Sequence, residues 1–347
     1  MKKSVEFIKE QRLENVLARK INTFGNTVKE EITYGAVSKI MFNDLSIVNN
    51  YMRFGGSRTG KYLESLEFIV VHDTGNNNLG ANGKMHSAFL ASGAKVSWHY
   101  TVDESGVIRN LPDNEIGFHA GDGLRPYGLN DTGIKVKNKK PHITISADGY
   151  YELDKEKSNV KAPLIKGEIA KTEDITPSGI FVKQGRNGNY YLNNTYYNSH
   201  YKLIANQGGG TNGIGIESCV DEGSNLYATW QNLAKLVAKL LVDNKLGLDR
   251  VMQHNHFSGK PCPQTLRTAN LWNYFISLVE AEYNLFKNFD DCKFEFVPDN
   301  EGILDNNGRV INPPEEDTIV EYAIIVKDFD FTEEVKLSSL VLGTKKL

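Results

Sequence analysis

The chain has 347 residues, of which 40% are hydrophobic and 24% are charged, and its formal net charge is −3. This composition is that of a folded globular protein and excludes wholesale disorder and collagen-like structure. The near-neutral charge gives no general attraction to nucleic acid. The charge is unevenly distributed, because residues 291–347 carry 13 acidic and 6 basic residues. The sequence therefore predicts a domain boundary near residue 290.

The cysteines and the amino-terminal segment bear on the compartment of the protein. Cys219, Cys262 and Cys292 are too few, and odd in number, for a disulfide framework. Charged residues recur in residues 1–16, where a secretory signal needs an apolar stretch, and the sequence has no apolar run of eighteen residues. We therefore expect synthesis in the cytoplasm without a signal peptide, and no membrane span.

The first predicted elements follow a weakly patterned amino-terminal extension, residues 1–60, to which the sequence assigns no role. The apolar run Glu67–His72 predicts a buried strand, and the turn-forming residues 73–78 follow it. Apolar residues recur at helical spacing in 85–90. Residues 97–108 then predict a hairpin.

The middle of the chain has a different residue composition. Half of the 16 tyrosines fall in residues 126–201, among Gly and Asn turns. This composition predicts a β-rich insertion of hairpins, which we place at 126–205. Regular structure returns at Gly213–Ser218, which predicts a second buried strand.

The last third of the chain predicts helices and then strands. Apolar residues from Trp230 to Leu241 lie on one face of an amphipathic helix. Val251–Met252 closes a short strand before a loop over 254–263, and 269–286 predicts a last helix. Short apolar runs separated by Pro and Asn-Asn-Gly make residues 289–347 a small acidic β domain, with a binding role left open. Residues 61–288 then form the main domain.

A loop near the end of that domain carries the sharpest chemical signal. His254 and Cys262, eight residues apart, can both face one metal ion. Zinc accepts such a mixture of nitrogen and sulfur ligands, and a catalytic zinc takes three protein ligands and leaves a fourth position for water. His72 ends a buried apolar strand, where an imidazole is unusual, so it is the candidate third ligand. Each histidine could alternatively be a hydrogen-bonded structural residue.

Two further residues suit the same site. Glu217 stands in the otherwise apolar strand Gly213–Ser218, where burial without a partner would be costly. It either faces solvent at a sheet edge or moves protons beside a metal-activated water. Lys260 precedes Cys262 by two residues, so its cation can reach the same cavity and stabilise an oxyanion, although a loop lysine is more often only solvated.

These residues occur within five motifs whose order resembles that of a known family. The motifs are VVHDTG at 70–75, SWHYTVD at 97–103, GFHAGDG at 117–123, IGIE at 214–217 and the loop 254–262. The sequence resembles the zinc-dependent N-acetylmuramoyl-L-alanine amidases of the type-2 amidase and peptidoglycan-recognition-protein superfamily, which includes phage endolysins and autolysins. The resemblance covers about residues 65–125 and 210–285.

The resemblance implies a fold and a set of roles. It implies an α/β fold with a central mixed β-sheet flanked by helices, and one zinc ion per chain in a surface groove. The zinc ligands would be His72, His254 and Cys262. Glu217 would be the proton shuttle, and Lys260 would polarise the scissile carbonyl.

Three further residues are candidates for substrate binding by the same resemblance. Histidines that match His99 and His119 tend to line the groove of the family. Trp98 stands where some members carry a tyrosine, and an indole cannot donate a phenolic proton. The sequence also departs from the family in two places. His256 stands where relatives often carry an acidic residue. The 126–205 insertion is far longer than the connection typical of the family.

The implied activity is hydrolysis of the amide between N-acetylmuramic acid and the L-alanine of the stem peptide by a zinc-activated water. The alternatives are a non-catalytic peptidoglycan-binding module or a structural component of a wall or virion. Binding modules of the superfamily usually lose the cysteine ligand, so Cys262 favours the enzyme. The expected partners are the glycan strand and the stem peptide. The expected site of action is the bacterial cell wall, reached by secretion or on lysis with a holin-type partner.

The residue composition of the insertion allows two interpretations. Its tyrosines can stack on sugar rings and its lysines suit an anionic wall polymer, in which case it extends the substrate groove. Alternatively, Tyr150, Tyr151, Tyr190, Tyr191, Tyr196 and Tyr197 are the β-forming residues that any small hairpin unit needs.

Overall fold

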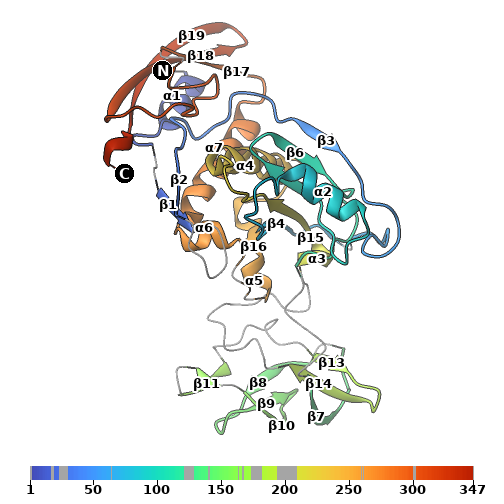
Figure 1. The fold of residues 1–347 in the computed structure, drawn as a ribbon. Coiled ribbons are helices and arrows are strands. Elements are labelled where there is room, and N and C mark those ends of the chain that lie inside the picture. The colour runs from blue at the N-terminus through green and yellow to red at the C-terminus, as the bar shows by residue number, and fades with distance from the viewer. Residues whose placement is uncertain are drawn as a thin grey trace.

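A computed structural model describes residues 2–16, 19–22, 30–63, 65–120, 129–139, 141–162, 164–165, 168–172, 182–193, 209–258, 260, 262–299 and 302–346. Figure 1 shows three parts: an α/β body, a terminal unit at the top to which both ends of the chain contribute, and a small β unit at the bottom. The helices are α1 (Lys3–Glu10), α2 (Gly83–Ala91), α3 (Gly209–Asn212), α4 (Leu226–Asp243), α5 (His254–Ser258), α6 (Gln264–Thr268) and α7 (Trp272–Asn288), with 3-10 turns at Leu248–Arg250 and Thr344–Lys346.

A six-stranded mixed sheet forms the centre of the body, as predicted. Its strands, in spatial order, are β16 (Val251–Gln253), β4 (Phe68–Asp73), β15 (Gly213–Ser218), β5 (Tyr100–Asp103), β6 (Gly106–Arg109) and β3 (Ile47–Asn49). The first four are parallel to one another, whereas β6 runs antiparallel to β5. The carboxyl ends of four neighbouring strands therefore meet at one edge of the sheet.

The alternation of side chains along these strands separates the core from the candidate site. Ile69 and Val71 of β4 and Ile216 of β15 pack in the main apolar core with α4 and α7. Because successive side chains of a strand point to opposite faces, His72 and Glu217 lie on the other face of the sheet. The two residues are direct neighbours in the parallel register.

Helix boundaries differ from the predictions in two places. The predicted loop 254–263 begins with the short helix α5. The predicted last helix begins at Trp272 rather than at 269, because Asn270 has a positive φ of 56° and separates α6 from α7. The amphipathic helix is α4, and the side chain of Asn225 caps it by accepting the N–H of Ala228 at 3.1 Å.

Both ends of the chain form one terminal unit, which the division into residues 1–60 and 289–347 had kept apart. An antiparallel sheet of β17 (Lys293–Pro298), β18 (Thr318–Asp328) and β19 (Phe331–Val341) packs against α1 and residues 34–42. Val5 and Ile8 of α1 are fully buried in this core. A further hairpin pairs β1 (Arg19–Asn22) with β2 (Glu30–Thr33).

Buried polar contacts join the terminal unit to the body. The Lys235 ammonium on α4 donates hydrogen bonds to the carbonyl oxygens of Met41 and Asn43, both at 2.8 Å. The Glu282 carboxylate on α7 accepts the N–H of Met41 at 2.6 Å. The segment around Met41 is thus bonded to two helices of the body: its carbonyl oxygens accept from α4, and its N–H donates to α7.

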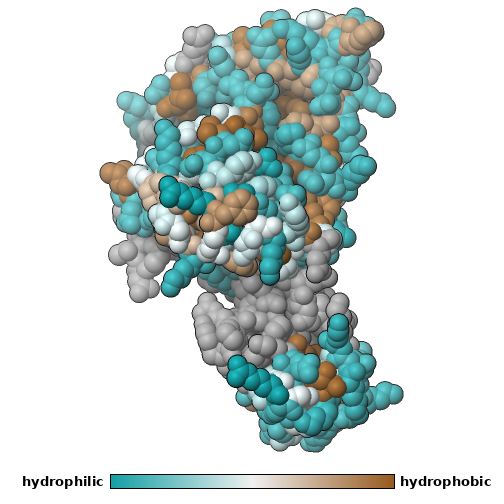
Figure 2. Space-filling model, turned by 90° about the vertical axis from the view of Figure 1, so that its right-hand side faces the viewer, coloured by the Kyte–Doolittle hydropathy of each residue, from teal (hydrophilic) through white to brown (hydrophobic). Residues whose placement is uncertain are grey.

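The insertion is a separate β unit in the described parts of 129–193. The strands are β7 (Leu129–Lys135), β8 (Ile143–Ile145), β9 (Tyr150–Leu153), β10 (Glu156–Lys161), β11 (Leu164–Ile165), β12 (Glu168–Ile169), β13 (Val182–Gln184) and β14 (Asn189–Asn193). They form two three-stranded sheets, β13-β14-β7 and β10-β9-β8, and one hairpin. Tyr151 and Tyr190 are buried in the core of this unit, while Tyr196 and Tyr197 lie outside the described residues. Its surface in Figure 2 is mostly hydrophilic, with a small apolar patch.

The chain leaves the body for the insertion and returns to it at neighbouring points. The N–H of Gly210 donates to the carbonyl oxygen of Ala120 at 2.8 Å, and the N–H of Gly117 donates to the carbonyl oxygen of Gly210 at 3.2 Å. The insertion therefore joins the body directly beside His119. No helix among the described residues is long and apolar enough to cross a membrane.

Candidate metal centre and active site

His72, His254 and Cys262 converge at the carboxyl edge of the sheet. His72 lies near the end of β4, and His254 directly follows β16, which pairs in parallel with β4. Parallel pairing places the residues after the two strands side by side. The loop after α5 then brings Cys262 back to the same point, because the N–H of Asn255 donates to the Cys262 carbonyl at 3.0 Å.

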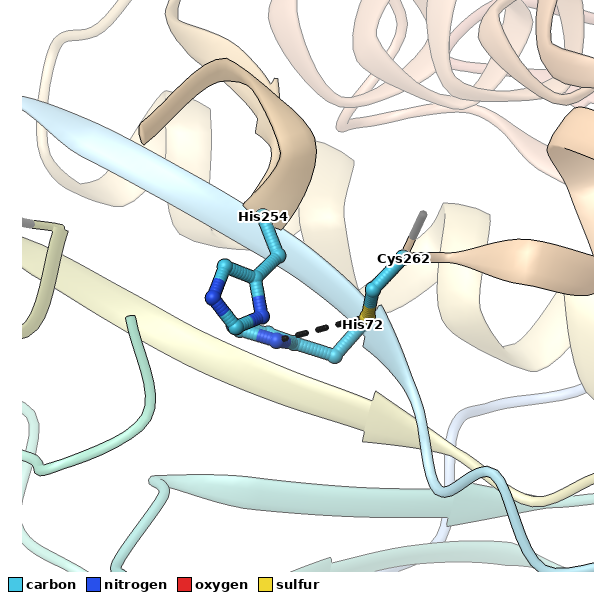
Figure 3. Close-up of side chains that lie close together, drawn as sticks. All are labelled: His72, His254 and Cys262. Atoms are coloured by element: carbon cyan, nitrogen blue, oxygen red, sulfur yellow. Dashed lines mark hydrogen bonds between the residues drawn. The ribbon is translucent and has the colours of Figure 1, made fainter. Parts of the chain in front are cut away.

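The geometry of these three residues suits one metal ion. Their ligand atoms all lie within 4.8 Å of one another, and Cys262 Sγ is 3.8 Å from His72 Nδ1 (Figure 3). Two ligands of a tetrahedral zinc, one sulfur and one nitrogen, are about 3.6 Å apart. His254 Nδ1 is buried and has no hydrogen-bond partner within the described part of the chain. Two imidazoles and one thiolate are a donor set that zinc accepts, with a fourth position left for water.

Burial determines the protonation of these groups. Desolvation lowers the pKa of His72 well below its usual value, and the nearby His254 and His119 lower it further. Desolvation, with the Lys260 charge, lowers the pKa of His254 to about 4. Burial raises the pKa of the Cys262 thiol. The imidazoles are therefore in the neutral form that binds metals, whereas the thiol must release a proton on binding.

Glu217 lies beside the three candidate ligands. Its Oε1 is 3.8 Å from His72 Nδ1, and its Oε2 is buried with no hydrogen-bond partner among the described residues. Burial, and then the charge of Asp73, raise the pKa of Glu217 well above its usual value, and Lys260 opposes this shift. The sequence alternative of a solvent-facing edge glutamate does not fit this position, because Glu217 lies on a central strand and its side chain is 14% exposed.

His254 and Glu217 line a cavity of about 380 Å³ on the α2 side of the sheet. The cavity is lined by Thr74, Asn76, Met85, His86, Phe89, Val96, Trp98, Phe118, His119, Glu217, His254 and Lys260. Its wall opposite the candidate ligands is apolar and aromatic, with the rings of Phe89 and Trp98 stacked 6.5 Å apart at 25°. Lys260 is solvent-exposed at the cavity, and its charge acts on both His254 and Glu217.

The three candidate substrate-binding residues have different environments. Trp98 lines the cavity, and its indole N–H donates to Thr101 Oγ1 at 2.7 Å. His99 is fully buried: its Nε2 donates to the Glu115 carbonyl at 2.9 Å, and its Nδ1 accepts the N–H of Gly215 at 3.0 Å. The structure therefore corrects the expectation for His99, which supports the sheet and has no ring nitrogen left for a ligand.

His119 lines the cavity and also contacts a candidate ligand. Its Nδ1 is 3.0 Å from His72 Nε2. His256, where relatives often carry an acid, is partly buried and contacts Met252 Sδ at 3.2 Å. Asn255, the residue between His254 and His256, holds the chain that follows α5 through its hydrogen bonds to Lys260 and Cys262.

Two residues that shape the site were missed in the sequence. The Asp73 carboxylate accepts the N–H of Thr265 at 2.8 Å, which ties the end of β4 to the helix after Cys262. The side-chain amide of Asn255 donates to the Lys260 carbonyl at 2.8 Å. An acid at the end of an apolar strand was a usable signal for Asp73, whereas nothing in the local pattern distinguished Asn255.

The fold and the site define a class of protein: an α/β domain in which two histidines and a cysteine converge beside a buried glutamate at the edge of a cavity, an arrangement that suits a metal-assisted hydrolase. The family model of N-acetylmuramoyl-L-alanine amidase matches residues 62–265, which is more than half of the chain. The chain belongs to this family.

Individual relatives are distant. The chain is 24% identical over 238 residues to the N-acetylmuramoyl-L-alanine amidase CwlH of Bacillus subtilis, covering 68% of this chain and 62% of CwlH. It is 32% identical over 93 residues to the amidase XlyA of the same organism, covering 26% of this chain and 31% of XlyA. The chain thus spans less than two thirds of these relatives. A mutant endolysin from Bacillus subtilis aligns with 68% of this chain and 99% of its own, at 21% identity and a TM-score of 0.42.

Proposed function

We propose that the chain is a zinc-dependent peptidoglycan amidase that hydrolyses the amide between N-acetylmuramic acid and the L-alanine of the stem peptide. The observation that carries this proposal is the convergence of His72, His254 and Cys262 beside Glu217, with His254 and Glu217 lining one cavity. Membership of the amidase family supports the choice of bond. The site of action would be the bacterial cell wall.

His72, His254 and Cys262 would hold one zinc ion. When bound, zinc supplies a Lewis acid for the amide carbonyl and lowers the pKa of a water ligand. Burial of the three residues favours this role, because it excludes competing water and keeps the imidazoles neutral.

Glu217 would transfer the proton. The carboxylate accepts a proton as water adds to the amide carbon, and it returns that proton to the nitrogen as the C–N bond breaks, so the products are a carboxylic acid and a free amine. The raised pKa of Glu217 suits both steps, since its carboxyl holds a proton at a higher pH than a surface glutamate does. Its unpartnered Oε2 is available for this exchange.

Lys260 and the aromatic wall would bind and polarise the substrate. The Lys260 ammonium, placed at the cavity, would stabilise negative charge on the carbonyl oxygen. Trp98 and Phe89 would pack against the apolar faces of the sugar or the lactyl group. The insertion, which joins the body beside His119, would extend the binding surface for glycan or stem peptide.

The decisive experiment measures zinc content and the release of new amino-terminal alanine from purified peptidoglycan. We expect one zinc per chain, loss of activity on chelation and recovery on adding zinc. His254→Ala should lose zinc, whereas Glu217→Gln should keep zinc and lose turnover. Glu222→Gln, an exposed glutamate in the same region, is the matched control and should remain active.

Three results would contradict the proposal. Full activity after thorough chelation would exclude the zinc mechanism. Release of reducing sugar instead of alanine would indicate a different bond. Binding to cell walls with no release by zinc-loaded protein would favour the non-catalytic binding module.

A further inference from the structure

His119 has a hydrogen-bonding partner on each ring nitrogen. Its Nε2 lies 3.3 Å from the carbonyl oxygen of Gly213, and its Nδ1 lies 3.0 Å from His72 Nε2. The His119 and His72 rings are perpendicular, with centroids 5.1 Å apart. His119 therefore bridges the backbone of β15 and a candidate metal ligand on β4.

These contacts determine which nitrogen of His72 can bind a metal. A carbonyl oxygen only accepts hydrogen bonds, so the hydrogen of the neutral His119 ring is on Nε2. His119 Nδ1 is then an acceptor, and His72 must donate from Nε2. The remaining lone pair of His72 is on Nδ1, the atom that lies 3.8 Å from both Cys262 Sγ and Glu217 Oε1. The network thus directs the free lone pair of His72 into the metal centre.

The backbone around His119 is built to receive its ring. A Cβ placed on Gly215 would lie 2.4 Å from His119 Cγ, and one on Gly117 would lie 2.9 Å from His119 Cδ2. Glycine inside a strand weakens it, so a glycine at a central position of β15 often marks a close approach of another group. The slot between Gly215 and Gly117 holds the ring in the orientation that its two hydrogen bonds need.

We propose that His119 is a positioning residue for His72: it fixes the tautomer and the ring orientation of this zinc ligand, and substrate contact is not its main role. The proposal rests on the proposed zinc site and gives a different role to a residue that the sequence made a candidate for substrate contact. A partner that accepts the second N–H of a ligating histidine orients the ring and raises its basicity. Here another histidine provides that acceptor.

The test compares two substitutions at His119 by their zinc affinity, measured by competition with a chromogenic chelator. His119→Phe keeps a ring for the glycine slot but removes the acceptor, and we expect its zinc dissociation constant to rise about 10- to 100-fold. His119→Asn keeps an amide oxygen near the position of Nδ1, so it should recover most of the affinity. At saturating zinc, KM for peptidoglycan fragments should change little in His119→Asn.

A matched control separates this effect from general damage to the cavity. His86 is a buried histidine of the same cavity whose ring packs on Trp98. His86→Phe should leave the zinc dissociation constant unchanged. An equal loss of zinc affinity in His86→Phe and His119→Phe would overturn the proposal, as would equal affinities for His119→Phe and the wild type.

A measurement on the wild-type chain covers the case in which the phenylalanine variant does not fold. Two-bond ¹H–¹⁵N correlation spectra should show the Nε2–H tautomer for both His72 and His119. An Nδ1–H tautomer of His119 would overturn the proposal. If the wild type binds no zinc, the proposed function fails as well, whereas zinc binding that is insensitive to His119 removes only the positioning role.

Discussion

Replacing Glu282 by glutamine should change how the stability of the protein depends on pH. Glu282 lies on α7, is 1% exposed and accepts the N–H of Met41. Its other oxygen, Oε2, has no hydrogen-bond partner among the described residues. Burial raises the pKa of Glu282 from 4.5 to about 7, although the Lys235 charge and the Met41 N–H act in the opposite direction.

The size of the effect follows from these two pKa values. Below pH 4.5 the carboxyl is protonated in both the folded and the unfolded chain, so its contribution to stability is fully present. As the pH rises toward 7, the unfolded chain releases the proton while the folded chain keeps it. The free energy of unfolding then falls by about 1.4 kcal/mol per pH unit, or about 3 kcal/mol in total. Above pH 7 the loss is complete.

The assay is denaturant unfolding of the wild type and Glu282→Gln at pH 5 and pH 8. Glutamine keeps an acceptor for Met41 and cannot ionise, so the variant should gain about 2.5 kcal/mol relative to the wild type between the two pH values, because part of the loss has already occurred at pH 5. Other groups titrate equally in both proteins and cancel in this comparison. Glu280→Gln, an exposed neighbour on α7, should keep the wild-type pH dependence. A constant difference between Glu282→Gln and the wild type at both pH values would refute the reasoning.

Four other predictions can be checked directly. Glu217→Gln should keep zinc and fold but lose turnover by about 10²-fold or more in the alanine-release assay. Lys260→Ala should lower kcat by about 10²-fold or more with unchanged zinc content, and an unaltered kcat would show that its charge is only solvated. Trp230→Ala should lower the free energy of unfolding by about 3–5 kcal/mol, because its side chain is 1% exposed in the main core. Replacing 126–205 by a short Gly/Ser linker should leave a folded body that binds zinc, since the insertion has its own core; full affinity and rate on intact peptidoglycan would disprove the groove extension.

The parts of the fold that local patterns determine could be predicted. Polar residues at the ends or alternate positions of apolar strands stood out, so the pattern singled out His72 and Glu217, and the family resemblance then assigned both to one site. Cys262 followed from ligand spacing along one loop. The sequence could not distinguish the environment of His99 from that of His119, because an aromatic residue directly precedes both histidines. Their difference depends on contacts with the distant Gly213 and Gly215.

The packing of the two chain ends in one core also could not be predicted from the sequence. Helix α1 and residues 34–42 are short, and their packing partners lie far away along the chain in β17–β19. No local pattern encodes a pairing over that separation. The predicted boundary near 290 reflects a real change in composition, yet α7 ends in contact with the terminal unit, through Ala281 and Leu285.

This shared core has a consequence for the order of events during biosynthesis. Val5 and Ile8 leave the ribosome long before their partners in β18 and β19, because the whole α/β body lies between them in the chain. The apolar face of α1 must therefore wait until the α/β body and the strands after it have been made, and it stays exposed to chaperones and proteases while the body folds. An expression truncation ending at residue 290 would make that exposure permanent and should aggregate, even though it retains every candidate catalytic residue.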